Sequence, residues 1–284
     1  MPSILVTGAT GNVGAEVVRQ LQQARYPVKA AVRDASARPQ SDDDVTWVSC
    51  DFMQPASYQA TLEGVDSLFL MRPPALTDTK RYINPLIDAA QQAGVQHIVF
   101  LSLLGAEKLS WVPHRHVETY LQGSGVAWTL LRAGFFMQNL STIHRDQIRA
   151  DKEILVPAGT GATSFIDVRD IAAVAVKALT EPGHRGQAYP LTGAEALDYY
   201  AVARVFSEVL GRPITYRNPS IWTFIRRMRQ RGVPLKFVLT MVAIYLPTRF
   251  GRAGTVTPDT AMILDRPPIT MRQFVEDHRT EWFP

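Results

Sequence analysis

Three glycines near the start of the chain have the spacing of a loop that binds phosphate. Gly8, Gly11 and Gly14 stand in ILVTGATGNVGAEVVRQL, between an apolar run and a segment of helical periodicity. Gly8 would allow a tight turn, Gly11 has no side chain to block a pyrophosphate, and Gly14 would let a helix pack close to a sheet. The free N–H groups of the helix N-terminus would face the anion. The spacing differs from the usual G-x-G-x-x-G, but its place between strand and helix predicts a dinucleotide-binding loop.

The end of the second predicted strand indicates which dinucleotide this loop would hold. The segment reads VKAAVRD, with Arg33 at the strand tip. An acidic residue here would bond the ribose 2′-OH, whereas a guanidinium matches a 2′-phosphate with two parallel hydrogen bonds. We therefore expect NADPH to be favoured over NADH, with a plain solvated arginine as the alternative. Asp34 is expected to start the next turn.

Other candidate residues stand where further strands are expected to end. In CDF, Asp51 and Phe52 could lie beside the adenine, or could form a strand-ending turn. In MRPP, Met71 is expected beside the cofactor, and Arg72 could meet an anionic group of cofactor or substrate or lie exposed. Ser102 could hydrogen-bond near the nicotinamide, or could be a serine satisfied within its strand end.

These residues come together only if strands alternate with helices, and the first half of the chain has that pattern. The predicted strands are Ile4–Val6, Val28–Val32, Val45–Ser49, Val65–Met71, Ile98–Leu101 and Val126–Leu131, and the helices between them include Val13–Leu21, Ile83–Ala93 and His116–Leu121. Such alternation predicts βαβ units and a parallel sheet. The fold class is therefore α/β, a Rossmann-type doubly wound parallel sheet whose ligands bind at the carboxyl ends of the strands.

Helical patterns dominate after about Ala133. The predicted helices are Val168–Leu179, Tyr199–Leu210, Ile221–Arg231, Leu235–Leu246 and Met271–Trp282, with short strands near Gln187–Leu191 and Ile214–Arg217. We expect residues 1–133 to form the NAD(P)-binding domain, with strands and helices able to return to it from 160–192. Residues 134–284 would then form a smaller, mainly helical substrate lobe.

The segment after the sixth predicted strand could form the floor of a substrate pocket. It contains Phe135, Phe136, Met137 and Asn139. An apolar floor with one amide would suit a flat aromatic substrate. Ordinary core packing explains the three apolar residues equally simply.

Composition limits the class of protein and its location. The 284 residues are 46% hydrophobic and 20% charged, with a formal net charge of +4 and a single cysteine, Cys50. An internal disulfide is excluded, and no metal site is expected. With no basic tail, nucleic acid is not an expected partner. With no visible leader, we expect a cytoplasmic protein.

Two late segments keep alternative interpretations. The apolar stretch Val233–Leu246 is shorter than the roughly 20 residues needed to span a bilayer, so no membrane span is expected. Three interpretations of this stretch stay open: a buried or lid helix, an interfacial helix, or a pairing surface for a homodimer. The run RRMRQR, Arg226–Arg231, is expected to be the solvated face of a helix, with docking onto an acidic partner or an anionic lipid surface as the alternative.

Together, several segments resemble the NmrA-like group of atypical short-chain dehydrogenase/reductases. They are ILVTGATGNVG, AAVRD, CDF, LRAGFFMQN and TVTPDTAMILDRPPITMRQFVEDH, and the resemblance runs from Ile4 to about Phe283. It implies a Rossmann fold with a small C-terminal substrate lobe and NAD(P)H as ligand. The group includes NADPH-dependent quinone, azo-dye and triphenylmethane-dye reductases, and also redox sensors that bind the cofactor without turning it over. The cofactor contacts it implies on this chain are Gly8, Thr10, Gly11, Asn12 and Val13 at the pyrophosphate, Arg33 at the 2′-phosphate, and Asp51 and Phe52 at the adenine.

The chain departs from the Tyr-x-x-x-Lys pair with which most of the superfamily catalyses. In SWVPHRHVETYLQGSG, counting back from Glu118 places His114 at the lysine position and Ser110 at the tyrosine position. Related quinone and dye reductases resemble this chain in having histidine there. A histidine of near-neutral pKa can donate a proton or a hydrogen bond to developing negative charge. His114 is therefore the main catalytic candidate; the alternative is a histidine at the helix start that faces solvent or bonds a neighbouring carbonyl.

Two functions are consistent with these features. The first is an NADPH-dependent oxidoreductase that transfers hydride to a quinone-like or conjugated aromatic acceptor, where the protein mainly positions the acceptor and stabilises charge. The second is a non-catalytic NADP(H)-sensing regulatory protein that binds a protein partner, which the missing Tyr-x-x-x-Lys pair supports.

Overall fold

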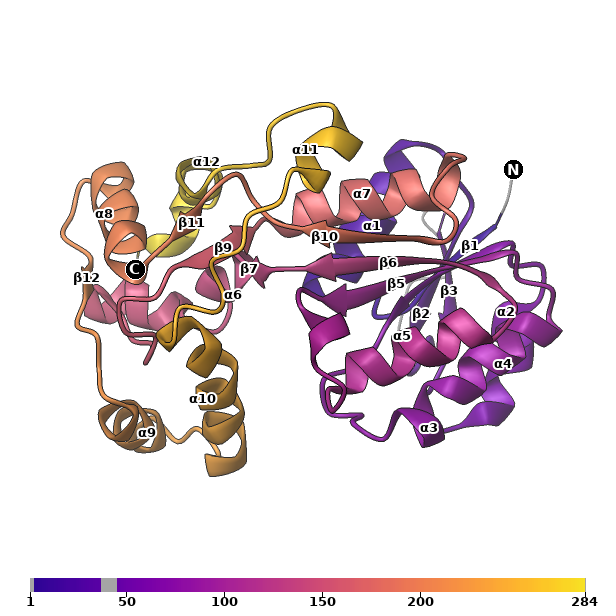
Figure 1. Cartoon of the computed structure of the whole chain (residues 1–284), viewed down its shortest axis with the longest axis horizontal. Coiled ribbons are helices and arrows are strands. Elements are labelled where there is room, and N and C mark those ends of the chain that lie inside the picture. The colour runs from indigo at the N-terminus through magenta and orange to yellow at the C-terminus, as the bar shows by residue number, and fades with distance from the viewer. Residues whose placement is uncertain (1–2, 37–44, 284) are drawn as a thin grey trace. The chain divides into compact units, whose positions relative to one another are not determined.

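Seven parallel strands form the sheet that the alternating pattern predicts (Figure 1). The computed structural model describes residues 3–36 and 45–283, and the strand order is β10-β6-β5-β4-β1-β2-β3. The strands are β1 Ile4–Val6, β2 Val28–Val32, β3 Val45–Ser49, β4 Ser67–Met71, β5 His97–Leu103, β6 Ala127–Ala133 and β10 Gln187–Leu191. Strand addition reverses direction between β1 and β4, which makes this the switch point where doubly wound sheets bind ligands. The predicted fold class is confirmed.

Helices cover both faces of this sheet, which explains why its strands are almost uniformly apolar. The helix α1 (Asn12–Gln23) packs with α7 (Val168–Thr180) on one face (Figure 1). The other face carries α2 Tyr58–Leu62, α3 Thr79–Tyr82, α4 Asn84–Gln92 and α5 Pro113–Gly123. The residues up to Ala133 and Val168–Leu191 together make the first of two structural units.

The second unit comprises Gly134–Asp167 and the chain from Thr192 onward. Its helices are α6 Gln138–Ser141, α8 Tyr199–Leu210, α9 Ile221–Gln230, α10 Leu235–Arg249, α11 Asp259–Leu264 and α12 Met271–Asp277. Short strands form two small sheets, β11-β9-β7 (Ala196–Leu197, Thr163–Ile166, Phe135–Phe136) and β12-β8 (Thr215–Tyr216, Glu153–Ile154). The mainly helical character of this part is as predicted.

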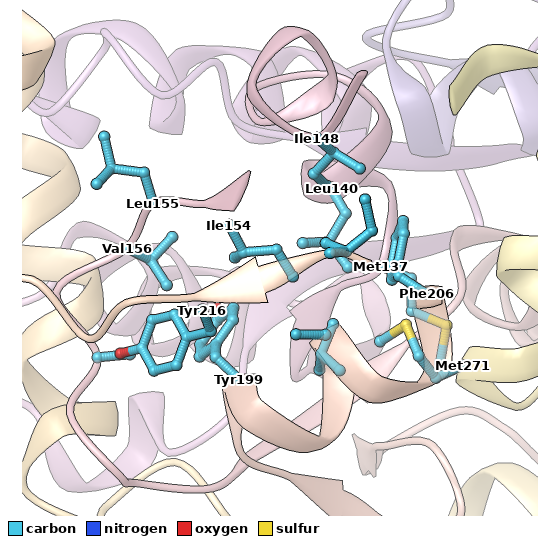
Figure 2. Packing of buried hydrophobic residues seen from close by; sticks show 14 of the residues in the cluster. Met137, Leu140, Ile148, Ile154, Leu155, Val156, Tyr199, Phe206, Tyr216 and Met271 are labelled. Carbon is cyan, nitrogen blue, oxygen red and sulfur yellow. The ribbon is translucent and has the colours of Figure 1, made fainter. Parts of the chain in front are cut away.

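A separate hydrophobic core holds the second unit together. Figure 2 shows apolar side chains from α6, β8, α8 and α12 in one cluster, among them Leu140, Ile154, Phe206 and Met271. Tyr199 lies fully buried in the same cluster. Burial of such side chains stabilises this unit.

The helix α10 does not end at Leu246, as the proline after it predicted, but continues through Pro247 to Arg249. A proline in the last turn removes one N–H, and its would-be acceptor, the carbonyl of Ala243, belongs to an exposed residue that water can reach. The next residue, Thr248, is buried, and its hydroxyl lies 3.2 Å from that of Thr163 in β9. This contact holds the final turn in place.

Within the described residues, no helix has the length and apolar character needed to cross a membrane.

Candidate functional site

The loop between β1 and α1 has the geometry of an anion cradle. Gly8 has a φ of +64°, in the left-handed region that favours glycine, and its carbonyl accepts a hydrogen bond of 2.9 Å from the N–H of Gly11. Gly11 is the N-cap of α1 and offers no side-chain acceptor to the first-turn N–H groups. The first turn of α1 holds no acidic residue, so no side chain of that turn neutralises the positive end of the helix dipole.

The space that a Cβ would meet at each position shows whether packing requires a glycine there. A Cβ on Gly14 would overlap the backbone carbonyl of Gly8, so glycine is needed there for helix and loop to pack. A Cβ on Gly11 would touch the Gly8 carbonyl oxygen and the Met71 methyl group at 3.4 Å, the short end of ordinary contact. Packing therefore does not explain glycine at position 11. A ligand lying against the backbone does, so the loop fits a dinucleotide.

The residues around this loop differ in what they can offer a ligand. Thr10 and Asn12 are exposed, whereas the side chain of Val13 is buried in the core. Val13 can therefore contribute only its backbone N–H. The buried Thr7, just before the loop, was not among the predicted residues. Its hydroxyl donates to the carbonyl of Phe69 and accepts from the N–H of Met71, which fastens the loop to the end of β4.

Arg33 lies exposed directly after β2. In the part of the chain that the structure describes, its guanidinium pairs with no carboxylate. Asp34 instead accepts hydrogen bonds from the N–H and hydroxyl of Ser36, at 2.9 and 2.7 Å, and forms the predicted turn. The guanidinium thus stays available to a phosphate group.

Asp51 and Phe52 follow β3 and are largely occupied by the fold. The Asp51 carboxylate accepts from the N–H of Met53 at 2.9 Å and from the side chain of Gln54 at 3.2 Å, which makes a strand-ending turn. Phe52 is buried in the core cluster that also contains Tyr58, whose hydroxyl donates to the Phe52 carbonyl at 3.0 Å. Contact with the adenine stays a prediction, and it would involve the Asp51 carboxylate and the local backbone rather than the Phe52 ring.

Arg72 folds back over the loop that follows β4. Its Nη1 donates to the carbonyls of Pro73, Pro74 and Leu76, at 2.9, 3.2 and 2.9 Å. Its Nε is buried and has no hydrogen-bond partner among residues 3–36 and 45–283. Burial lowers the pKa of this guanidinium, which still carries its charge at neutral pH. Among the described residues, the side chain therefore holds a buried donor that no other group accepts from.

His114 lies in the first turn of α5, half-buried, with its ring 6.3 Å from that of Phe100. Its Nδ1 is buried and unpartnered by the described residues. Burial and, to a smaller extent, the nearby charge of Arg72 lower the pKa of His114, the charge of Glu118 opposes them, and the net pKa is about 4. The near-neutral pKa expected from the residue type is therefore wrong. At neutral pH the imidazole is uncharged, with one N–H donor and one acceptor nitrogen.

Glu118, one helical turn after His114, is the centre of a buried polar network. Its carboxylate is fully buried and accepts from Ser102 Oγ at 2.7 Å, from Arg132 Nε and Nη2 at 2.9 Å each, and from Arg115 Nη1 at 3.2 Å. Burial raises the pKa of Glu118, but these hydrogen bonds outweigh it and leave the pKa below its ordinary value. The network ties α5 to β5 and β6, and so fixes the position of His114.

The network also bears on the predicted role of Ser102. Because its hydroxyl proton points to Glu118, Ser102 can offer a ligand only acceptor capacity. The geometry favours the satisfied strand-end serine of the two interpretations. Neither Glu118 nor Arg132 was predicted to have a role, although an acid four residues after His114 must lie on the same helix face.

Comparison with known proteins now identifies the family. A family model described as the NmrA-like family matches residues 2–255. The chain belongs to the NmrA-like family. This NmrA-like chain is 39% identical to the NAD(P)H azoreductase of Xenophilus azovorans over 97% of both chains. The predicted resemblance is confirmed.

Two solved structures are similar to this NmrA-like protein over nearly its whole length. The triphenylmethane reductase of Citrobacter sp., complexed with NADP(H), has a TM-score of 0.85 and 27% identity, covering 97% of this chain and 99% of that one. The NADPH-dependent quinone oxidoreductase of Escherichia coli, complexed with NADPH, has a TM-score of 0.87 and 26% identity, covering 96% and 99%.

The predicted acceptor segment of the NmrA-like protein lies in the second unit. Phe135 and Phe136 form β7 and pair with β9, both half-buried. The Phe135 ring packs edge-on against Phe165 at 5.8 Å. Met137 is buried in the core, whereas Asn139 is half-buried in α6. Met137 thus serves packing, and contact of this segment with an acceptor stays a prediction.

Proposed function

We propose that this protein is an NADPH-dependent oxidoreductase that transfers hydride to a quinone-like or other conjugated aromatic acceptor. One observation carries the proposal. Arg72 and His114, near enough for the charge of one to affect the other, each hold a buried nitrogen with no partner among the described residues. Buried polar atoms are normally paired, so two at the switch-point end of the sheet point to a bound ligand. The names of the azo-dye, quinone and triphenylmethane reductases to which the chain is similar support the reaction class.

Each part of the site would have a separate task. The first turn of α1, with Gly11, would hold the pyrophosphate, and Arg33 would pair with the 2′-phosphate. The bound nicotinamide supplies the hydride. Arg72 as a fixed cation and His114 as a neutral N–H donor would stabilise the negative charge that the acceptor gains. Because His114 is uncharged at neutral pH, the proton that completes the reduction would come from solvent.

The role of His114 can be tested through kcat. His114→Ala is expected to lower kcat about tenfold to a hundredfold, because a hydrogen bond to a charged group contributes about 1.5–3 kcal/mol. His114→Gln, which keeps an N–H donor, is expected to retain most of the activity. Steady-state rates of NADPH oxidation with a quinone or dye would measure both variants. Equal losses in the two variants would contradict a donor role.

The low pKa of His114 gives a second readout on the same variants. The direction of the pKa shift is set mainly by burial, which disfavours the charged imidazolium, and the resulting pKa is about 4. Between about pH 6 and 8 the imidazole should not titrate, so we expect no His114-dependent change in kcat there. A pH–rate profile of wild type and His114→Ala would decide this. An inflection near pH 6.5 that disappears in His114→Ala would overturn it.

Arg33 is expected to determine the choice of cofactor. Arg33→Ala should raise the KM for NADPH by about tenfold to a hundredfold, the effect of losing a charge-assisted hydrogen bond, and leave the KM for NADH nearly unchanged. Arg19→Ala is the matched control, because Arg19 is an exposed arginine of α1 that pairs with Glu16. Equal losses for NADPH and NADH in Arg33→Ala would exclude a 2′-phosphate contact.

A further inference from the structure

The segment from α9 to the loop after α10 has an unusual charge. Between Glu208 and Asp259 the sequence contains no acidic residue, although the formal net charge of the whole chain is only +4. The basic residues of 221–252 are Arg226, Arg227, Arg229, Arg231, Lys236, Arg249 and Arg252. This segment therefore has a strong positive field of its own.

Acidic residues from elsewhere in the second unit neutralise only part of this charge. Glu153 binds Arg227 with two hydrogen bonds, of 2.8 and 2.7 Å, and Asp151 pairs with Arg231. The exposed basic side chains without a carboxylate partner among the described residues are Arg226, Arg229, Lys236 and Arg252. Among the described residues no carboxylate neutralises these four cations, although Arg229 donates a hydrogen bond of 2.9 Å to the carbonyl of Val233, so their charges can act on an anionic surface.

Aromatic and apolar side chains are exposed among these cations. Trp222 is 81% exposed and lies at i, i+4 and i+7 spacing with Arg226 and Arg229, so the three share one face of α9. In α10 only a narrow stripe is buried, formed by Val238, Met241, Tyr245 and Thr248. The exposed apolar side chains of α10 and its C-cap are Leu235, Phe237, Leu239, Ile244, Leu246 and Phe250. A helix that is apolar all round is normally covered, and this one is covered on one side only.

The combination of charges and apolar side chains identifies one kind of occupant. A second copy of this segment would bring two sets of uncompensated cations together, which repel. A bilayer with acidic headgroups offers negative charge and an apolar layer within a few ångströms of each other. The 15 residues of α10 extend about 22 Å, short of the ~30 Å hydrocarbon core, so the helix would lie in the interface rather than cross it.

We propose that α9 and α10 bind the surface of an anionic lipid bilayer, with the arginines on the headgroups and the exposed Trp, Phe and Leu side chains in the interface. The proposal does not depend on the redox function. It predicts binding to vesicles of phosphatidylcholine with about 30% phosphatidylserine, weaker binding to phosphatidylcholine alone, and loss of most binding at high salt.

Vesicle co-sedimentation with matched variants of the full chain tests the assignment. Arg226→Glu/Arg229→Glu is expected to reduce the partition coefficient on phosphatidylserine vesicles by roughly tenfold or more, since each basic residue adds about a fivefold effect. Leu239→Ser/Ile244→Ser should reduce it through the apolar contact. Lys80→Glu/Arg279→Glu makes the same charge change at exposed sites outside the segment and should have little effect. Thermal unfolding would establish that each variant is folded.

Three results would overturn the proposal. The first is absence of vesicle binding, or equal binding to charged and neutral vesicles. The second is an equal loss of vesicle binding in Lys80→Glu/Arg279→Glu, which would show that net charge, and not this segment, determines binding. The third is a dimer in solution that the α10 variants dissociate while vesicles stay unbound, which would make a second copy the occupant.

Discussion

Gly14→Ala is expected to lower the stability of the protein, whereas Gly11→Ala is expected to leave stability unchanged and to weaken NADPH binding about a hundredfold. The difference follows from what a methyl group would meet at each position. At Gly14 it would overlap the backbone carbonyl of Gly8, and a backbone cannot yield as a flexible side chain does. At Gly11 the chain leaves room for it, so only a bound pyrophosphate would be displaced.

The expected effects of Gly14→Ala and Gly11→Ala are large enough to be measured by different methods. Overpacking at Gly14 should cost about 3 kcal/mol, which for a chain of this size lowers Tm by about 6–12 °C. Loss of charge-assisted hydrogen bonds at Gly11 should appear in a calorimetric titration with NADPH and as a smaller ligand-induced rise in Tm. If Gly11→Ala destabilised the ligand-free protein as much as Gly14→Ala, position 11 would be a packing glycine and the argument for a cofactor cradle would fail.

Glu118→Gln is expected to produce the second large effect, a loss of about 3 kcal/mol in the free energy of unfolding at neutral pH, because it leaves the largely buried Arg132 cation without its buried carboxylate. Glu107→Gln is the matched control. Glu107 pairs with the same arginine at 3.3 Å but is 35% exposed, so its removal should cost at most about 1 kcal/mol. Denaturant unfolding of the two variants would compare them directly.

The pH dependence of the Glu118 effect follows from its lowered pKa. A carboxyl group whose pKa is lower in the folded protein than in the unfolded chain stabilises the fold above its ordinary pKa, and loses this contribution as the pH falls through the folded value. The advantage of wild type over Glu118→Gln should therefore be complete at neutral pH and shrink below the ordinary value of 4.5. An advantage that stayed constant through that range would show that the ionised carboxylate is not what stabilises this network.

The sequence predicts the Rossmann sheet because its signals are local. Alternating apolar runs and helical periods are readable over a few residues, and Gly8, Gly11 and Gly14 occupy one short stretch. The exact ends of strands are harder to predict from the sequence, because pairing with neighbouring strands decides them. β5 extends to Leu103 because that residue pairs with Ala133 of β6. The two-residue strands β7, β8, β11 and β12 are too short to show any period.

The site shows the same division between local and long-range information. Asp34 forms the turn that its place after the strand predicts, whereas the contact of Arg33 with a 2′-phosphate stays a prediction. The pKa of His114 could not be predicted, because it depends on burial and on Arg72, which approaches from the end of β4. Ser102 could not be placed either, since its partner Glu118 comes from a different element. Chemistry set by contacts between elements becomes visible only in three dimensions.

The proposed reductase activity is tested most directly by following NADPH absorbance with the purified protein and, in turn, a quinone, an azo dye and a triphenylmethane dye. We predict acceptor-dependent consumption of NADPH with at least one class, one NADPH per two-electron reduction, strongly reduced in Gly11→Ala and in His114→Ala. Tight NADPH binding with no consumption across all three classes would contradict the account and favour a protein that senses the cofactor without using it.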